Sequence, residues 1–267
     1  FGLSQSGTQF SAIERNQVGS ALEAITAWQL CEIRSPFGES VYFNYDDYNY
    51  SYNTLSGEFI NLANGSVSDY DPIDYSYSGY TRKTVVNTVK SKALKTISGR
   101  FGSVQFQNTT RTDISGAPKL TAITISNSQG TLCKKLQLLY DYSIGGRLTL
   151  NKVQEISTAS NLVAIDLYTI DYNLSETLPS HDPAYAGYNS QDLWGYYNGV
   201  ANSRLIQSEY VSVFGTQLNL KLFTGADRHA DETKMKAGII SQIRYASGGV
   251  TKFDFEANKF YGNNYQN

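Results

Sequence analysis

The sequence predicts an all-β fold: a large, curved, mostly antiparallel sheet of consecutive hairpins, with few short helices. The main observation is a hairpin-sized phrase that occurs twice, over residues 30–48 and 240–258. A second observation is that tyrosine supplies 21 of the 35 aromatic residues, while methionine occurs once. A tyrosine ring is apolar but has a polar tip, so it suits sheet surfaces that are only half covered. Repetition of this kind indicates architecture and not a catalytic centre.

The repeated phrase reads LCEIRSPFGESVYFNYDDY in its first copy and ISQIRYASGGVTKFDFEAN in its second. Aligned without a gap, Gly38 falls on Gly248 and Phe43 falls on Phe253. Each copy has an aliphatic segment, a glycine-bearing turn and a second segment in which aromatic and polar residues alternate. A two-residue period is typical of a strand with one drier face, so each copy predicts a hairpin.

Two short helical turns are expected, over residues 21–27 and 230–237. Residues 46–82 are rich in Tyr, Asp, Ser and Asn and contain few aliphatic residues. Tyr-x-Tyr alternation is present there, but no aliphatic set is available to anchor a core. We therefore expect a long loop with marginal strands over 46–82.

Looser copies of the hairpin pattern follow at uneven intervals, over 94–106, 120–142 and 147–172. Each has a Leu-x-x-Ile-like segment, a glycine-bearing turn or a polar turn, and an aromatic strand. A second long loop is expected over 174–204, followed by one or two strands over 210–223. Consecutive hairpins pair with their neighbours, so the sheet should be a meander.

The turn glycines should set the strand register, because a slip of one residue exchanges the two faces of a strand. These glycines are Gly38, Gly102, Gly130 and Gly248. One face of the sheet is expected to form the core. The predicted core residues are Leu30, Ile33, Val41, Phe43, Ile97, Leu120, Ile123, Tyr140, Leu148, Val153, Ile243 and Phe253.

Length and charge limit the classes of function. We expect residues 1–267 to form one β-rich repeat module, and the start at Phe1 suggests a fragment of a longer chain. The net charge is −2 and no run of basic residues occurs, which argues against a nucleic-acid partner. No apolar stretch approaches the ~18 residues of a membrane-spanning helix, so no membrane insertion is expected.

The two cysteines, Cys31 and Cys133, lie far apart in the sequence. Buried free thiols are one interpretation and a single disulfide is the other. The two histidines, His181 and His229, are not at ligand spacing from either cysteine. We therefore expect no metal site and no cofactor.

Two phrases carry a family resemblance. Residues 248–258, GGVTKFDFEAN, and Tyr140-Asp141-Tyr142 followed by Gly146-Arg147-Leu148 resemble the YD repeat of the Rhs family. The wider chain resembles segments of large secreted bacterial proteins of uncharacterised role with degenerate YD-type repeats. The other shared phrases are AWQL from Ala27, LKTI from Leu94, RTD from Arg111, RLTL from Arg147 with VQE from Val153, WGYYNG from Trp194 and ADR from Ala226.

The resemblance implies a secreted or cell-surface location and a strand-rich wall that can enclose a cargo domain. Its partners would be neighbouring segments of the same parent protein, with an enclosed cargo or a glycan as further candidates. The chain departs from the repeat where Phe255-Glu256 replaces the Tyr-Asp pair and where the spacing is uneven. No terminal toxin domain or self-cleaving aspartyl signature occurs in it.

No catalytic constellation stands out. Ser180-His181-Asp182 has the residue types of a hydrolase triad, but a triad is defined by geometry and adjacent loop residues rarely converge. Asp227-Arg228-His229 is equally explained as a loop that precedes a short helix. The paired carboxylates Asp46-Asp47 would serve glycoside hydrolysis only at a set separation across a cleft. We therefore expect a non-enzymatic structural module.

The best candidate binding surface is the aromatic loop 181–199, HDPAYAGYNSQDLWGYYNG. Planar rings beside amides and carboxylates suit a sugar or an aromatic-rich protein surface. The alternative function is thus a carbohydrate- or protein-binding adhesin module, and the competing structural interpretation is that the loop caps an end of the sheet. The candidate ligand-binding residues are Tyr185, Tyr188, Asp192, Trp194, Tyr196, Tyr197 and Asn198.

Overall fold

The computed structural model describes residues 12–62, 77–158, 163–213 and 219–257. Within these ranges the chain is all-β, and its only helices are the one-turn 3-10 helices η1 (Ala186–Asn189) and η2 (Lys234–Lys236). Helix η2 lies within the predicted turn over 230–237. The other helical turn, predicted over 21–27, is wrong because strand β2 occupies that segment. The all-β prediction is confirmed.

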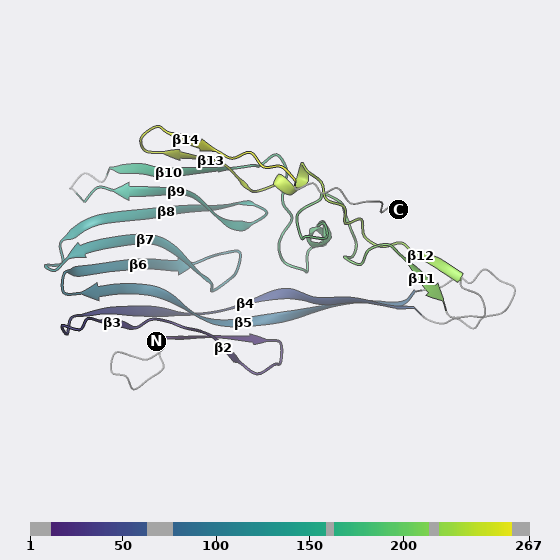
Figure 1. The fold of residues 1–267 in the computed structure, drawn as a ribbon, viewed down its shortest axis with the longest axis horizontal. Coiled ribbons are helices and arrows are strands. Elements are labelled where there is room, and N and C mark those ends of the chain that lie inside the picture. Colours follow the sequence, from purple (N-terminus) through teal and green to yellow (C-terminus); the bar gives the residue numbers. More distant parts are fainter. Residues whose placement is uncertain (1–11, 63–76, 159–162, 214–218, 258–267) are drawn as a thin grey trace.

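Twelve strands form one open, mostly antiparallel sheet (Figure 1). The strands are β1 (Ile13–Val18), β2 (Ala24–Trp28), β3 (Glu32–Arg34), β4 (Ser40–Leu62), β5 (Tyr77–Gly99), β6 (Gly102–Thr110), β7 (Pro118–Asn127), β8 (Leu132–Ile144), β9 (Arg147–Ile156), β10 (Ala164–Tyr172), β13 (Ile240–Tyr245) and β14 (Val250–Lys252). A separate hairpin contains β11 (Glu209–Val213) and β12 (Asn219–Phe223). From β4 to β10 every strand pairs with the next one along the chain, as expected for a meander.

Strands β4 and β5 form a ribbon of two 23-residue strands that extends beyond the rest of the sheet (Figure 1). The predicted loop over 46–82 is therefore wrong for 46–62 and 77–82, while 63–76 lie outside the described residues. Polar cross-strand pairs replace aliphatic anchors here: Asn87 donates to Thr54 Oγ1 at 2.7 Å, and Lys95 contacts Asp46 at 2.8 Å. Tyrosine and threonine favour the pleated conformation without a buried face.

The two copies of the repeated phrase form the same hairpin. Ile33 pairs with Val41 as Ile243 pairs with Thr251, 210 residues further along. The Gly38 N–H donates to Ser35 O at 3.0 Å, and its counterpart Gly248 N–H donates to Tyr245 O at 2.9 Å. Their φ angles are +88° and +84°, so each loop is a turn closed by a left-handed glycine. The prediction of two like hairpins is confirmed.

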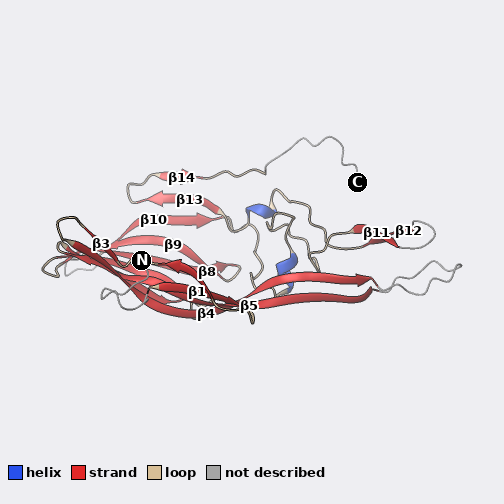
Figure 2. Ribbon diagram, turned by 60° about the horizontal axis from the view of Figure 1, so that its bottom comes forward, coloured by secondary structure: helices blue, strands red, loops and turns tan. Residues whose placement is uncertain are grey.

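The sheet is a single layer (Figure 2), and this overturns the predicted core. None of the twelve predicted core residues is buried, and Ile33, Val41 and Phe253 are 53%, 38% and 38% exposed. Among the described residues no large side chain is fully buried. Alternation along a strand reports which residues share a face, but it does not report whether a second layer covers that face. Neighbouring side chains on the sheet give partial cover only.

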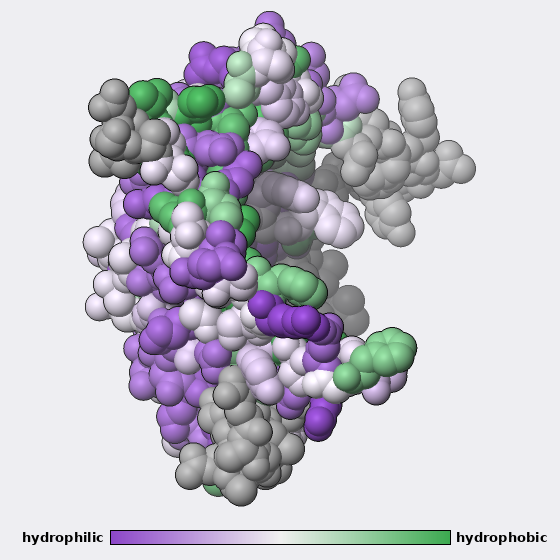
Figure 3. Space-filling view, turned by 90° about the vertical axis from the view of Figure 1, so that its left-hand side faces the viewer, coloured by the Kyte–Doolittle hydropathy of each residue, from purple (hydrophilic) through white to green (hydrophobic). Residues whose placement is uncertain are grey.

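The turn glycines Gly38, Gly102, Gly130 and Gly248 lie at one end of the sheet, and all four have positive φ. Figure 3 looks at this end and shows hydrophobic side chains interleaved with hydrophilic ones. At the opposite end, the turn between β8 and β9 is the two-residue loop Gly145-Gly146, with φ of +56° and +71°. Two consecutive left-handed residues are the mark of a type I′ hairpin turn.

Residues 174–238 form an insertion between the neighbouring strands β10 and β13, and they include the predicted loop 174–204. The insertion leaves and rejoins the sheet at one place, because Gly238 N–H donates to Asn173 O and Asn173 N–H donates to Ile239 O, both at 2.8 Å. It lies beyond the ends of the central strands, next to the far half of the β4–β5 ribbon (Figures 1 and 2). The site described below is built from this insertion.

Candidate functional site

Buried amides hold the insertion together. Asn202 Nδ2 donates to Asp227 O at 2.7 Å and to Asn189 O at 3.3 Å, while its Oδ1 accepts from the Asp227 N–H at 2.9 Å. Asn198 Nδ2 donates to Asp227 O at 3.1 Å and to His229 O at 3.2 Å. These amides satisfy backbone groups that the irregular chain leaves without a ladder partner. The insertion is thus a defined unit, although most of its described residues lie outside strands and helices.

Arg228 joins three parts of the same unit. Its Nε and Nη1 donate to the carbonyl oxygens of Gln191 and Leu205, each at 3.3 Å, and its Nη2 donates to Asp192 O. The planar guanidinium presents several donors in a fixed fork, which suits the capture of converging carbonyls. The sequence phrase around Arg228 therefore marks a fastening point of the loop.

Two of the predicted ligand-binding residues belong to this framework. Asp192 is 2% exposed, and its Oδ1 accepts from the Trp194 N–H at 2.8 Å and the Tyr196 N–H at 2.9 Å. Asn198 is 4% exposed, and both of its amide atoms are engaged by backbone groups. Since their polar atoms already have partners inside the loop, they shape the site and do not face a ligand.

The five predicted aromatic residues separate into two groups. Tyr185, Trp194 and Tyr196 are exposed, with Trp194 the most exposed at 81%. Tyr188 and Tyr197 are partly buried, and together with Tyr196 they line a cavity. Tyr185 and Trp194 thus lie outside the cavity, whereas Tyr188, Tyr196 and Tyr197 form part of its wall.

The insertion is docked on the β4–β5 ribbon by charged side chains. Arg82 Nη1 donates to Asn189 Oδ1 at 2.9 Å, and the Arg82 guanidinium lies 5.3 Å from the centre of the Tyr188 ring. The Leu205 N–H donates to Glu58 Oε2 at 2.6 Å. Arg82 thus links the β5 strand to Asn189 and to the ring of Tyr188, which forms part of the cavity wall.

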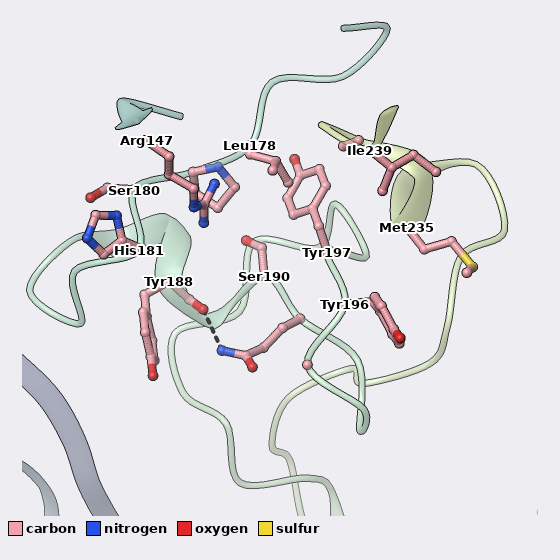
Figure 4. A pocket seen from close by; sticks show the side chains of 14 residues that line it. Arg147, Leu178, Ser180, His181, Tyr188, Ser190, Tyr196, Tyr197, Met235 and Ile239 are labelled. Carbon is pink, nitrogen blue, oxygen red and sulfur yellow. Dashed lines mark hydrogen bonds between the residues drawn. The ribbon is translucent and has the colours of Figure 1, made fainter. Parts of the chain in front are cut away.

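The cavity has a volume of about 350 Å³ and lies between the insertion and the β8–β9 turn (Figure 4). Its polar lining is contributed by Arg147, Ser180, His181, Ser190 and Gln191. Apolar atoms come from Leu178, Pro179, Met235, Ala237 and Ile239, and rings from the three tyrosines named above. A volume above about 300 Å³ with a few convergent polar groups is the usual description of a small-molecule pocket.

Arg147 is the one charged side chain among the described residues that line this cavity. Its Nη1 is buried and has no hydrogen-bond partner, and the same is true of His181 Nδ1. Burial lowers the pKa of the Arg147 guanidinium, because the charged form loses water without gaining a counter-charge. Sequence reasoning noted Arg147 only as part of a repeat phrase, since its neighbours come from the distant insertion.

A second arginine near the same turn is fully paired. Arg111 Nε and Nη2 donate to the two carboxylate oxygens of Asp113, at 2.7 and 2.5 Å, and the Leu148 N–H donates to Asp113 Oδ2 at 2.9 Å. Burial alone would raise the pKa of Asp113, but Arg111 and the backbone donors hold it at about 2. This carboxylate fastens the β6–β7 turn to the start of β9.

Two other groups considered in the sequence contain a histidine beside an aspartate. In one of them, Asp227 Oδ1 lies 2.7 Å from His229 Nδ1, and both side chains are more than half exposed. No side-chain hydrogen bond joins Ser180, His181 and Asp182, although the Asp182 N–H donates to Ser180 Oγ at 3.3 Å.

The two cysteines are free thiols, as in the first of the two interpretations. Cys31 is buried, but Cys133 is exposed, so the burial that this interpretation expected is wrong for Cys133. Cys133 lies near the β7–β8 turn, where the single-layer sheet has no cover.

Among the residues that the structure describes, no group of three His, Cys, Asp or Glu is placed to hold a metal ion. Over the same residues, no helix has the length and apolar character needed to cross a membrane. Comparison of the chain with family models, curated proteins and solved structures found no match. A function is therefore inferred from the chain's own residues and geometry.

Proposed function

We propose that the chain is a non-enzymatic structural module, a piece of the β wall of a secreted or cell-surface protein that resembles the Rhs family. Its partners are neighbouring segments of the same parent protein, and an enclosed cargo is the further candidate. The observation that carries the proposal is a single-layer sheet that ends, on two different edges, in copies of the same hairpin.

The edges leave backbone groups available for pairing. In the described part of the chain, β14 pairs only with β13, and β3 pairs only with β4. Along an antiparallel ladder, residue pairs that exchange backbone hydrogen bonds alternate with pairs that do not. Tyr245 N–H donates to Gly249 O, so this pair is hydrogen-bonded and the next pair along the β13–β14 hairpin is not. The amides of Val250 and Lys252 therefore point away from β13. An edge of this kind invites another strand.

The other edge has the same design. In the β3–β4 hairpin, Ser35 N–H donates to Glu39 O, so the same alternation of hydrogen-bonded and non-hydrogen-bonded pairs applies. The amides of Glu32 and Arg34 therefore point away from β4. A neighbouring segment that carries the repeated phrase would thus meet matching hairpins at either edge. Edge-to-edge pairing of successive segments would extend the sheet into a wall.

The proposal is tested by association of the chain with itself, because a second copy carries both edges. Sedimentation velocity should show an average mass that rises with protein concentration. Lys252→Pro removes one outward N–H without removing a β13–β14 hydrogen bond, so it should abolish the association while the chain stays folded. Lys252→Ala is the matched control, because it keeps the N–H and should associate like the original chain.

Arg34→Pro makes the same test at the other edge and should also stop growth of the assembly. A chain that remains monomeric at every concentration would contradict the proposal. Equal association of Lys252→Pro and Lys252→Ala would contradict it as well, since strand pairing through this edge requires the amide.

A second candidate, an adhesin module, is favoured by the exposed rings of Tyr185, Trp194 and Tyr196. Such rings bind sugars or protein surfaces through their flat apolar faces. Binding on a glycan array that disappears in Trp194→Ala, with an unchanged melting temperature, would support this function. Equal binding by both proteins would remove Trp194 from any such site.

A further inference from the structure

We infer that the cavity between the β8–β9 turn and the insertion is a binding site for a small hydroxylated carboxylate, such as a sugar acid, with Arg147 as its anion anchor. This inference is independent of the wall function, because it concerns the interior of the insertion and not the sheet edges.

Backbone geometry fixes the position of Arg147. It is the first residue of β9, directly after the type I′ turn Gly145-Gly146, and it pairs with the buried Ile144. The turn lies close against the insertion: a Cβ built on Gly145 would be 2.7 Å from Leu178 O. A Cβ on Gly238 would be 2.6 Å from Ile144 Cγ2. The backbone at the start of β9 is therefore held at the cavity by close packing, and Arg147 Nη1 lies against the turn, 2.7 Å from the same Cβ position on Gly145.

The charge of Arg147 is not neutralised by its surroundings. No Asp or Glu is among the described residues that line the cavity, and Nη1 has no hydrogen-bond partner. Asp113, in the β6–β7 turn, already accepts hydrogen bonds from Arg111 with both of its carboxylate oxygens. Arg147 is half-buried, and a half-buried cation without a counter-ion loses hydration without compensation, so a ligand that supplies the missing charge would be bound favourably.

The remaining lining indicates the class of anion. Arg147 is the single permanent cation at the cavity, which matches one carboxylate better than a doubly charged phosphate. Ser190 offers a hydroxyl and Gln191 offers its Oε1, since the Gln191 Nε2 already donates to Tyr188 O at 2.8 Å, and Figure 4 shows Arg147, Ser190 and Tyr197 directed at the same space. Hydroxyl and amide groups beside tyrosine rings suit a polyhydroxylated ring.

The test is titration calorimetry of the whole chain with glucuronate. Glucose is the control without the carboxylate, and inorganic phosphate is the control anion without the sugar ring. Glucuronate should bind more tightly than either. Arg147→Met keeps the aliphatic stem but removes the charge, and it should weaken glucuronate binding roughly 10- to 100-fold. Arg100→Met, at an exposed arginine on the far end of the sheet, should leave the affinity unchanged.

Thermal unfolding separates a ligand role from a structural role. Without ligand, Arg147→Met should melt at the same temperature as the original chain or above it, since a half-buried charge without a counter-ion has been removed. Glucuronate should raise the melting temperature of the original chain and not that of the variant.

The inference is overturned if glucuronate does not bind, if glucose or phosphate binds as tightly, or if Arg147→Met binds equally well. It is also overturned if the variant unfolds or melts at a lower temperature without ligand. In that case the arginine stabilises the fold, and Arg147→Lys should then restore the melting temperature.

Discussion

Replacement of Asp113 by asparagine should destabilise the chain at neutral pH and change how its stability depends on pH. The Asp113 side chain is 2% exposed, accepts two hydrogen bonds from Arg111, and accepts further bonds from the Leu148 and Ile114 amides. Asparagine has nearly the same shape but no charge. The substitution therefore removes the ion pair and leaves the guanidinium of Arg111 without its counter-charge.

The magnitude follows from the pKa of Asp113. Its value of about 2 lies below the ordinary 3.8, and each pKa unit corresponds to about 1.4 kcal/mol. The charged form thus contributes about 2 kcal/mol to the free energy of unfolding. Because the pKa is lowered by folding, this contribution is complete above about pH 4 and is lost as the pH falls toward 2. For a chain of this length the expected fall in melting temperature at pH 7 is about 4–8 °C.

Chemical and thermal unfolding at pH 7, 4 and 2 would measure the effect. The difference between the original chain and Asp113→Asn should be largest at pH 7 and should shrink between pH 4 and pH 2. Glu39→Gln removes an exposed ion pair to Arg100 and should leave the melting temperature at pH 7 nearly unchanged. A difference for Asp113→Asn that stays constant down to pH 2 would refute the reasoning.

Three further predictions follow from burial and backbone geometry. Gly248→Val should lower the free energy of unfolding by about 2 kcal/mol, because φ is +84° although the space is open, whereas Lys252→Ala should cost little; equal melting temperatures would contradict this. Asn202→Ala should lower local stability by about 2–4 kcal/mol, because buried backbone groups lose their hydrogen-bond partners. The rate of amide hydrogen exchange should then rise in residues 186–230 but not in the central strands. Cys133 should react with a maleimide in the folded chain and Cys31 only on unfolding; equal rates in mass spectrometry would count against the burial of Cys31.

The hairpins could be predicted from the sequence because their information is local. A left-handed glycine such as Gly248 closes a turn in one way only, and the alternation around it fixes which residues face each other. The two copies of the phrase accordingly have the same register. The fold class and the meander follow from repetition of that local signal.

The wrong predictions are those that assumed a second layer of structure packed against the sheet. Residues 46–82 were expected to form a loop because they lack aliphatic anchors, but a polar two-stranded ribbon is stabilised by its ladder and its cross-strand pairs. The same assumption produced the predicted core face. Ile33 and Phe253 alternate correctly, and they remain exposed because nothing within the described chain covers the sheet.

The candidate site shows a similar division. The aromatic loop 181–199 could be recognised from its composition, but the division between exposed rings and cavity walls depends on how the insertion docks. Arg147 could not be recognised, because its environment is made by residues 31–92 positions further along the chain. The local cue is a Gly-Gly turn followed by arginine, and that cue alone does not distinguish a surface residue from an anion anchor.

Residue-resolved hydrogen exchange of β14 in dilute solution tests the central claim most directly. Thr251 and Phe253 face β13, and their amides should exchange slowly, while the amides of Val250 and Lys252 should exchange at nearly the unprotected rate. At high concentration the two fast amides should become protected as the edge pairs with another copy. Equal protection of all four amides in the dilute monomer would mean that the edge is already covered, and the account of an open wall segment would be wrong.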